Sequence, residues 1–577
     1  MGAETGRRWR IAAMEHDRSA TLATALGVSP LLAHLLLQRG CATPEAARAF
    51  LEAPLSALHD PLRMTGMAEA AARLQQAISQ HQPIWVCGDF DVDGVTGIAL
   101  LVGGLTHAGA DVTYAVPNRH EHGYGLPTAI VHQAADAGGR LLVTVDHGIS
   151  SIESAILARQ RGLDLIICDH HLPPPVLPPA TAILNPRQPG CRYPFQDLCG
   201  VGIAFKLIQA LYGPAAQEEC WPLLDLVTLG TVADLVPLLG ENRILVKHGL
   251  GYLAATTRPG ILALAEVAGA KLSEPGWATP GRIGFGLAPR INAAGRLTDA
   301  GIAVRLLLTT DIAEARQIAT ELDKHNKDRQ LLEIGILESA LAETAATHDL
   351  ARDRAIVAAA PDWHPGVLGI VASRLVERFN RPTALIAITG DTARGSVRTA
   401  CGLHVADTLT RCGDLLTAHG GHRAAGGFSL PAAGIAAFRE RFLAVAAETI
   451  ADEALEPTLG IDAEASLDAL DLSITDALAP HGLGNPAPVF ATRQVQVMRF
   501  PRRVGKNHLK IRVRQTGGEK VIEAIGFNLG EYVDPLEAAI APQVDLAYVP
   551  ERNVWNGQES LQLRIRDLRP LPDPPRP

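Results

Sequence analysis

The sequence predicts an α/β protein with a parallel-sheet lobe, a smaller α/β second lobe joined to it by a long helix, and a C-terminal β-barrel. Its 577 residues are too many for one hydrophobic core, so about two to four domains are expected. In two stretches of the chain, short apolar runs alternate with amphipathic helical segments, which is typical of parallel sheets covered by helices. The last part of the chain changes to short strands at regular spacing, as in a small barrel.

The composition excludes several classes of protein. Hydrophobic residues make up 47% and charged residues 20%, which excludes wholesale disorder. The net charge of −9 excludes a general binder of polyanions, so any contact with nucleic acid must depend on local basic patches. Eight cysteines without a CxxC pair argue against a zinc site or a disulfide framework, and for a reducing compartment. Since no apolar run reaches the length of a membrane span, we expect a cytoplasmic protein with no membrane partner.

The first α/β pattern falls in residues 66–260, after an N-terminal segment, residues 1–65, that reads as short helices. Strands and helices alternate there, which predicts right-handed crossovers and a mostly parallel sheet with helices on both faces. The expected strands are Ile84–Cys87, Val112–Val116, Leu141–Val145 and Leu165–Cys168. The helices expected between them include Val95–Ala108 and Ser151–Arg161.

A connector, a second lobe and a barrel follow. Residues 261–347 are helical and end in a long polar helix without proline, 311–347, which suits a rigid connector between two lobes. Residues 348–454 form the second α/β lobe, and residues 455–570 form the barrel. The strands expected in these two domains are Ala355–Ala359, Thr383–Ile388, Val495–Met498, Leu509–Val513, Lys520–Phe527, Val544–Val549 and Ser560–Ile565.

Acids and histidines follow three of the four strands of the first lobe, where ligands bind in open parallel sheets. These residues are Asp89, Asp91 and Asp93 after the first strand, Asp146 and His147 after the third, and Asp169, His170 and His171 after the fourth. If the first of these segments stays extended, its three carboxylates project to one side and repel one another unless cations lie between them. Oxygen-rich ligands with one or two imidazoles suit Mg²⁺ or Mn²⁺, and a paired site of this kind can activate water and clamp a phosphoryl group.

Each of these motifs has a less specific explanation. A single aspartate after a strand is more often a turn or helix cap, and a DxD pattern alone is weak. Asp234 lies in the apolar helical context GTVADLVPL, where the alternative is a helix-end cap. Three acid-rich strand ends at one edge of a sheet are much harder to explain as caps, so we favour a metal site.

The motifs, taken in order, resemble those of a known family. GDFDVDG, PNRHEHGYGL, VDHGIS, CDHH and GTVADLVPL resemble the successive motifs of the DHH phosphoesterase family. GSVRT, HGGHRAAGGF and HGLGNPAPVF resemble the second lobe and C-terminal region of its RecJ-type single-strand-specific exonucleases. The resemblance implies two Mn²⁺ or Mg²⁺ ions and catalytic roles for Asp93, Asp146 and His171, the last as a ligand or as a support of the transition state. It implies metal ligands at Asp89, Asp91, Asp93, Asp146, His170 and Asp234.

The resemblance also implies where DNA is held. Arg119 and Tyr124, in PNRHEHGYGL, are expected near the scissile end, where the tyrosine ring offers a face for base stacking. Ser396 and Arg398, in GSVRT, combine a hydroxyl with a guanidinium fork, which suits a terminal phosphate. The alternative for the arginine at position 119 is an ordinary surface salt bridge.

Three further segments are candidates for contact with DNA. Gly421 and His422 belong to a glycine-dense segment whose amides could approach phosphate, although such a segment is often only a turn. The segment APRINAAGRL is expected to be a loop that faces the cleft, and its alternatives are structural; its candidates are Arg290, Asn292 and Arg296. In the barrel, a basic stripe suggests an OB-like fold that tracks a single strand of DNA, and the alternative is an ordinary solvated face. Lys510, Arg512 and Arg514 alternate along one expected strand and so share a face. The residues of the stripe are Arg502, Arg503, Lys506, His508, Lys510, Arg512 and Arg514.

The implied activity is hydrolysis of single-stranded DNA from its 5′ end to 5′-mononucleotides, in DNA repair and recombination. A helicase and a single-stranded-DNA-binding protein are the implied partners, and a cleft between the two lobes is expected to exclude duplex. One alternative is an oligoribonuclease or nucleotide phosphatase of the same family, against which the C-terminal span argues. The other is a non-catalytic strand-binding scaffold, against which the intact set of acids argues.

Overall fold

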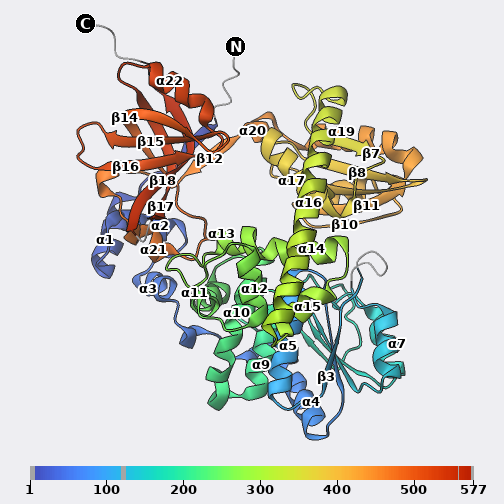
Figure 1. The fold of residues 1–577 in the computed structure, drawn as a ribbon. Coiled ribbons are helices and arrows are strands. Elements are labelled where there is room, and N and C mark those ends of the chain that lie inside the picture. Colours follow the sequence, from blue (N-terminus) through green and yellow to red (C-terminus); the bar gives the residue numbers. More distant parts are fainter. Residues whose placement is uncertain (1–6, 119–124, 556–557, 573–577) are drawn as a thin grey trace. The chain divides into compact units, whose positions relative to one another are not determined.

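The computed structural model describes residues 7–118, 125–555 and 558–572, and it confirms the predicted α/β class (Figure 1). Its contacts divide the chain into two compact units. The first unit combines Ile11–Asp323 with Gly460–Pro577, and the second combines Lys324–Leu459 with Met1–Arg10. The predicted long helix is α16, Ile312–Thr347, and it contributes residues to both units.

A five-stranded, fully parallel sheet lies in the first unit. Its strands are β2 (Ile84–Gly88), β3 (Val112–Ala115), β4 (Leu141–Val145), β5 (Asp164–Cys168) and β6 (Ala182–Leu184). Their order is β3-β2-β4-β5-β6, and all four predicted strands are present to within one residue at each end. Strands β2 and β4 are buried along their whole length, as expected for a parallel sheet that is covered on both faces.

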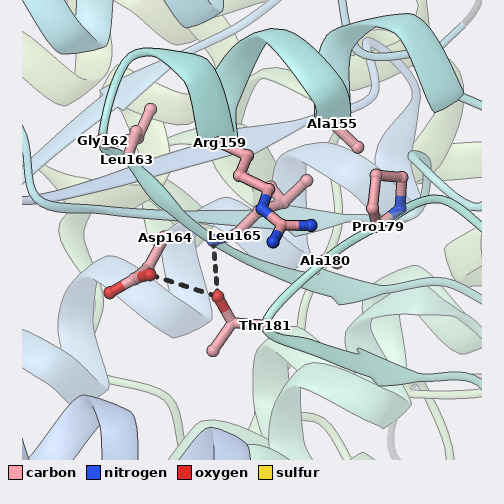
Figure 2. A pocket seen from close by; sticks show the side chains of 9 residues that line it. All are labelled: Ala155, Arg159, Gly162, Leu163, Asp164, Leu165, Pro179, Ala180 and Thr181. Atoms are coloured by element: carbon pink, nitrogen blue, oxygen red, sulfur yellow. Dashed lines mark hydrogen bonds between the residues drawn. The ribbon is translucent and has the colours of Figure 1, made fainter.

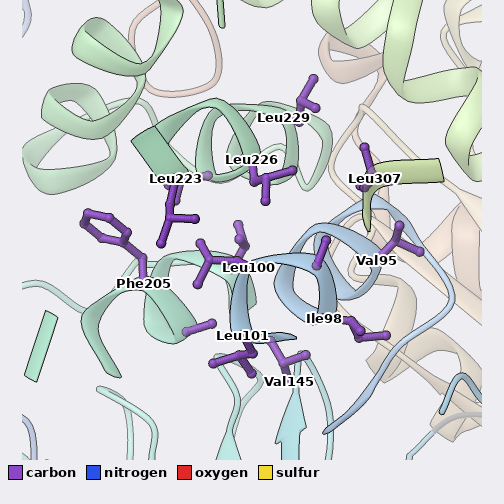
Figure 3. Packing of buried hydrophobic residues seen from close by; sticks show 14 of the residues in the cluster. Val95, Ile98, Leu100, Leu101, Val145, Phe205, Leu223, Leu226, Leu229 and Leu307 are labelled. Atoms are coloured by element: carbon purple, nitrogen blue, oxygen red, sulfur yellow. The ribbon is translucent and has the colours of Figure 1, made fainter. Parts of the chain in front are cut away.

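Helices of the first unit pack against this sheet or against the helices that cover it (Figure 1). They are α4 (Met67–Ser79), α5 (Val92–His107), α7 (Thr128–Asp136), α8 (Ile152–Gln160), α9 (Gly200–Tyr212), α10 (Leu224–Ala233), α11 (Gly240–Ala254), α12 (Pro259–Val267), α14 (Ala288–Leu297) and α15 (Gly301–Leu308). Val86 of β2 belongs to the core formed with α5 and α9, and Trp85 belongs to the opposite core formed with α7 and α8. In the first core, Leu100 and Phe205 are fully buried (Figure 3), and each such side chain contributes roughly 1.5–3 kcal/mol. This packing on both faces of the sheet holds the carboxyl ends of its strands in place.

The C-terminal region forms the predicted barrel. Its main strands are β14 (Phe490–Val504), β15 (His508–Gln515), β16 (Val521–Gly526), β17 (Gln543–Trp555) and β18 (Gln558–Pro570). Strand β14 pairs with β15 on one side and with β17 on the other, so the sheet closes on itself. Strands β16 and β18 are parallel, and the other pairings between these five strands are antiparallel. All five predicted strands are therefore present, three of them much longer than predicted.

Three N-terminal helices share a hydrophobic core with this barrel. They are α1 (His16–Leu26), α2 (Pro30–Gln38) and α3 (Pro44–Glu52). Leu35 of α2 lies in the same buried cluster as Phe490 of β14. Arg243 of α11, only 1% exposed, lies 3.8 Å from the ring centroid of Phe50 and donates a hydrogen bond of 3.0 Å to Leu478 O. The first and last parts of the chain are thus packed together, which the sequence did not predict.

The second unit contains a mixed sheet. Its strands are β7 (Ile356–Ala360), β8 (Thr383–Thr389), β9 (Thr392–Arg398), β10 (Ala418–Gly421) and β11 (Ala425–Pro431), and its helices include α17 (Leu368–Phe379), α18 (Val405–Arg411) and α19 (Ile435–Thr449). The order is β10-β11-β9-β8-β7, and only β7 and β8 are parallel. The glycine-dense segment forms β10 and β11 rather than a mere turn. Because glycine has no side chain, β10 and the start of β11 lack the period-two pattern by which a strand is recognised in sequence, and only Phe428 and Leu430 of β11 alternate as buried apolar residues.

Two findings concern the expected environment. In the described part of the chain, no single helix has both the length and the apolar composition of a membrane span; the bent pair α1 and α2 meets these two criteria only together. All eight cysteines are free, and seven of them are buried. Buried free thiols fit the expectation of a protein without a disulfide framework.

Candidate active site

Acidic and histidine side chains follow the carboxyl ends of three neighbouring strands. Asp89 follows β2, Asp146 follows β4, and Asp169 with His170 follows β5. Since β4 lies between β2 and β5, these three strand ends adjoin. Open α/β sheets bind their ligands at this edge. The structure thus brings together the residues of the three sequence motifs.

The possible ligand atoms of these residues form overlapping groups, and within each group all atoms lie within 4.8 Å of one another. The groups are Asp89, Asp91 and Asp146; Asp93, His170 and Asp234; and Asp146, His170 and His171. His170 Nε2 lies 3.1 Å from Asp146 Oδ1 and 3.8 Å from Asp234 Oδ2, so the first two groups adjoin through His170 and Asp146. All six predicted metal ligands therefore lie in two neighbouring clusters, with Asp234 supplied from the end of α10.

The first motif does not stay extended, which corrects one step of the sequence argument. Helix α5 begins at Val92, and Asp91 is its N-cap: Asp91 Oδ1 accepts the backbone N–H groups of Asp93 and Gly94 at 2.9 and 3.2 Å. The argument from alternation along a strand was wrong, because the strand ends before Asp89. The turn into the helix instead separates Asp93 from the other two aspartates, so the carboxylates fall into two clusters. Asp91 is both a helix cap and a member of an acidic cluster.

Burial and mutual repulsion raise the pKa values of three carboxyl groups. Burial, followed by the charge of Asp91, raises the pKa of Asp93 to about 7. The pKa values of Asp146 and Asp234 also lie well above the usual range, first because of burial and then because of the neighbouring aspartates. Asp234 Oδ2 is buried and has no hydrogen-bond partner among the described residues. This excess of negative oxygen ligands beside an imidazole fits divalent cations such as Mg²⁺ or Mn²⁺.

The N-terminus of α9 holds Asp93 in place. Gly200 N and Val201 N donate hydrogen bonds of 2.6 and 2.8 Å to the two carboxylate oxygens of Asp93. These charge-assisted bonds favour the ionised carboxylate and oppose the effect of burial. A Cβ on Gly200 would lie 2.6 Å from the Cβ of Asp146, so a side chain has no room there. Neither donor is predicted from the sequence, where the only signal is a glycine at the start of a helix.

Asp169 orients His171. The carboxylate can only accept, so His171 Nδ1 donates to Asp169 Oδ1 over 2.7 Å, while Asp169 Oδ2 accepts the backbone N–H of Ile149 at 2.9 Å. Burial alone would lower the pKa of His171, but the hydrogen bond and charge of Asp169 outweigh it and raise that pKa. The bond leaves Nε2 as the ring nitrogen that can face a ligand or substrate. This orienting role of Asp169, which begins the DHH triplet, is not predicted from the sequence.

Helix α14 braces the first motif. Asn292 Oδ1 accepts the backbone N–H of Val92 at 3.1 Å. A Cβ on Gly295 would lie 2.3 Å from Phe90 O, so the helix backbone touches the motif directly, next to Arg296. The prediction of a loop at this segment is wrong, because residues Ala288–Leu297 form a helix. The proline of this segment stands in the first turn of the helix, where no backbone N–H is needed, so it does not interrupt the helix.

In the second unit, Ser396 and Arg398 lie together on β9. Arg398 Nη1 donates to Ser396 Oγ over 2.9 Å, and the two side chains share a face of the sheet because they are two residues apart. A Cβ on Gly369, at the start of α17, would lie 2.4 Å from Arg398 Nη2, so this helix covers the pair closely. Gly421 ends the edge strand β10, and His422 follows it; both are exposed.

The other predicted DNA contacts differ in whether the structure describes them and in whether they are already bonded within the protein. Arg119 and Tyr124 lie outside the described residues. Arg290 Nε donates to Asp323 over 2.9 Å, so this guanidinium is already engaged within the protein. In the barrel, polar residues of β15 alternate with buried ones, which gives the predicted basic face of Lys510, Arg512 and Arg514.

A pocket of about 400 Å³ lies at the opposite end of β5 (Figure 2). Arg159, Asp164 and Thr181 are among its lining residues, and Asp164 is engaged by Thr181 and by Arg73 at 2.6 Å. Because Asp164 begins β5 whereas His170 follows its end, this pocket lies away from the acidic clusters. We do not assign it to the chemistry of the site.

Three family models match the chain in the order of its parts. The DHH family N-terminal domain matches residues 83–231, the DHHA1 domain matches 352–452, and the RecJ OB domain matches 461–567. Together with the parallel sheet and the paired acidic clusters, these matches define a DHH phosphoesterase.

Individual RecJ proteins and their crystal structures are similar to this chain over nearly its whole length. The chain is 38% identical over 569 residues to the single-stranded-DNA-specific exonuclease RecJ of Bacillus subtilis, a match that covers 97% of this chain and 70% of that one. The crystal structure of RecJ in complex with Mn²⁺ from Thermus thermophilus is similar with a TM-score of 0.80 at 33% identity, covering 98% of this chain and 80% of that one. Its complex with Mg²⁺ gives a TM-score of 0.76 at 31% identity, covering 98% and 79%. The chain belongs to the RecJ family, as its motifs predict.

Proposed function

We propose that this protein is a metal-dependent exonuclease that hydrolyses single-stranded DNA from the 5′ end and releases 5′-mononucleotides. The observation that carries the proposal is the pair of adjoining clusters at the carboxyl ends of β2, β4 and β5, in a chain of the RecJ family. The solved Thermus thermophilus relative holds Mn²⁺ or Mg²⁺, and the clusters described above have the donors that such ions require.

The residues of the site have separable tasks. Asp89, Asp91 and Asp146 would hold one ion, and Asp93, His170 and Asp234 would hold the other. When bound, a pair of such ions supplies the means to activate water and to neutralise charge on the phosphoryl and leaving oxygens. His171, held through Nδ1 by Asp169, presents Nε2 as the atom that can exchange a proton with, or donate a hydrogen bond to, the reacting phosphate.

The direction of hydrolysis rests on the second unit. The guanidinium of Arg398 and the hydroxyl of Ser396 form one polar pair that suits a terminal 5′-phosphate. Gly421, His422 and Arg296 are further proposed contacts with the strand, as are Arg119 and Tyr124 of the second motif. The basic face of β15 supports a role of the barrel in tracking the strand.

The biological setting follows from this activity. Enzymes that shorten one strand act in DNA repair and recombination, where a helicase supplies single strands and a single-stranded-DNA-binding protein covers them; we propose both as partners. Eight free cysteines, mostly buried, support a reducing compartment such as the cytoplasm.

One experiment tests the activity and its direction. Oligonucleotides labelled at either the 5′ or the 3′ end are incubated with the protein in Mn²⁺, in Mg²⁺ and in a chelator. We expect 5′-label to be released first as mononucleotide from single-stranded DNA, little release from blunt duplex, and none in the chelator. Release of 3′-label first would contradict the proposed direction, and equal cleavage of RNA would favour the oligoribonuclease alternative.

A further inference from the structure

The glycine-containing motif HGLGN, residues 481–485, has no part in the function proposed above. It lies in the C-terminal part of the chain, between helix α21 (Leu472–Leu478) and β14. In the first unit this 481–485 segment contacts the loop that follows Asp234, residues 235–239. A segment near the C-terminal barrel therefore touches the loop that leaves a proposed metal ligand.

The backbones of the 481–485 segment and the 235–239 loop lie close together. Leu238 N donates to Leu483 O over 2.7 Å. A Cβ on Gly482 would lie 2.6 Å from Leu238 Cδ1 and 3.0 Å from its Cγ. A Cβ on Gly484 would lie 3.1 Å from the Cβ of Pro237, and Gly484 has a φ of +75°, which glycine adopts without strain. Both glycines are thus needed for the two backbones to lie so near each other.

The 481–485 segment is itself rigidly held. Gly482 and Asn485 exchange backbone hydrogen bonds of 2.9 and 3.2 Å. The side chain of Asn485 is fully buried; its amide donates to Leu478 O and Pro480 O at 2.7 and 2.8 Å, and its carbonyl accepts from Arg39 Nε at 2.8 Å. Every polar atom of this side chain is therefore engaged, and the segment can act as a fixed support.

The loop after Asp234 takes part of its support from this segment. Leu235 directly follows with a φ of +60° and a side chain that is 69% exposed, so the chain turns sharply there without a hydrophobic anchor. Two buried residues then anchor the loop: Val236, which is 8% exposed, and Leu238, which is 2% exposed and carries the hydrogen bond to Leu483. From the other side, Asn242 donates to Pro237 O over 3.1 Å.

Asp234 differs from the other ligands in how it is oriented. The carboxylate of Asp93 accepts two backbone N–H groups, and that of Asp91 accepts two more. Asp234 Oδ2 is buried without a hydrogen-bond partner among the described residues. Apart from the 3.8 Å ion-pair contact between Asp234 Oδ2 and His170 Nε2, its position is set by its backbone, which α10 fixes on one side and the 235–239 loop on the other.

We propose that the 481–485 segment positions Asp234, so that the C-terminal part of the chain helps to complete the metal centre. This inference rests on the metal centre assigned under the proposed function and adds a positioning role to it. Gly482 and Gly484 are positioning residues here, since they act on the metal through Asp234 and its loop.

The test is the affinity for Mn²⁺ of the full-length Gly482→Ala variant, measured without DNA from the electron paramagnetic resonance signal of free Mn²⁺. We expect one of the two bound ions to be held about 10- to 100-fold more weakly, the range typical when the support of a metal ligand is removed. The added Leu238→Ala substitution removes the atoms that the new methyl group would strike, so the double variant should regain part of the Mn²⁺ affinity.

Controls separate this role from ordinary packing. Gly460→Ala, in strand β12 (Thr458–Ile461), places a methyl group where nothing lies within 4 Å, and its Mn²⁺ affinity should equal that of the unmodified protein. If Gly482→Ala does not fold, Gly484→Ala, whose methyl contacts are longer but whose φ of +75° also strains an alanine, should weaken Mn²⁺ binding in the same direction. A lower unfolding temperature with unchanged Mn²⁺ affinity would overturn the inference. Because no DNA is present, this result stands apart from any failure of the proposed nuclease activity.

Discussion

Gly200 donates its backbone N–H to Asp93 over 2.6 Å and at the same time leaves no space for a side chain against Asp146. One residue thus orients a carboxylate of one acidic cluster while it packs on a member of the other. The distance between the two clusters is therefore set partly by a glycine that carries no chemistry of its own.

Gly200→Ala should impair the site without unfolding the protein. The methyl group would lie 2.6 Å from Asp146 Cβ and 2.9 Å from its Cα, so the start of α9 must move and its hydrogen bonds to Asp93 must lengthen. We expect a loss of about 10- to 100-fold in Mn²⁺ affinity, with a parallel loss of nuclease rate below saturation. Gly103→Ala, in α5 with nothing within 4 Å, is the matched control and should be slightly stabilising. Equal behaviour of the two variants would refute the role of Gly200.

Asp146→Asn should raise the stability of the metal-free protein while it abolishes hydrolysis. Asparagine tolerates the φ of +66° at this position and removes a charge that repels the neighbouring aspartates. The metal-free variant should therefore unfold at a higher temperature than the metal-free parent. The parent should gain about 2.7 kcal/mol at an Mn²⁺ concentration of about 100 times its Kd, and the variant much less. Thermal unfolding with and without Mn²⁺ checks both statements.

The same variant should no longer hydrolyse DNA, although it should still bind a single strand, because the proposed DNA contacts on the second unit and barrel are unchanged. Nuclease assays and strand-binding titrations at one fixed salt concentration test this. An unchanged rate at saturating Mn²⁺ would remove Asp146 from the metal centre.

Arg398→Ala should weaken binding of 5′-phosphorylated strands by about 10- to 100-fold, since a charge-assisted hydrogen bond contributes about 1.5–3 kcal/mol. Strands with a 5′-hydroxyl should lose much less. Arg398→Lys should recover only part of the loss, because lysine lacks the planar fork. The measurement is a pair of rate curves on matched oligonucleotides. Equal losses on both kinds of end would exclude recognition of the terminal phosphate by this residue.

Gly369→Ala gives an independent check on the same pair. Its methyl group would lie 2.4 Å from Arg398 Nη2 and 3.2 Å from Ser396 Oγ, and the guanidinium is the part that can move away. The preference for phosphorylated ends should therefore fall although Arg398 is still present. A variant that retains the full preference would show that the observed position of the guanidinium is not the one that binds phosphate.

His481 should make stability depend on pH. Burial, followed by the positive charge of Arg39, lowers its pKa from 6.5 to about 4. Between about pH 4 and pH 6.5 the unfolded chain therefore binds a proton at His481 that the folded protein does not bind. The contribution of neutral His481 to the free energy of unfolding is complete above about pH 6.5 and is lost as the pH falls towards about 4. The full difference corresponds to about 3 kcal/mol. Unfolding midpoints across this pH range should fall less steeply for His481→Gln; parallel curves would show that another group is responsible.

The sequence predicted the strands of the parallel sheet well because strong apolar runs end there at glycine and aspartate. It failed where a contact joins distant parts of the chain. The role of Gly200 depends on a helix that begins far along the chain from Asp93, and no local pattern records that pairing. Strand β10 and the start of β11 carry too few side chains for a period, and the helix at Asn292 contains a proline, an asparagine and a glycine, which are common in loops. The six proposed ligands, by contrast, stand next to strand or helix ends and were found from motifs alone.

The core shared by α1 to α3 and the barrel has a consequence for how this protein is made. A ribosome delivers Leu35 long before Phe490, yet both belong to one buried cluster, so the apolar faces of the first helices stay uncovered until the last strands emerge. Likewise, the guanidinium of Arg243 lacks its hydrogen bond to Leu478 O until residue 478 has been synthesised. A nascent or truncated chain thus lacks its closing contacts, including those of the 481–485 segment. The 481–485 segment and the barrel must therefore be synthesised before a hydrolase that could damage the cell's own single strands is fully assembled.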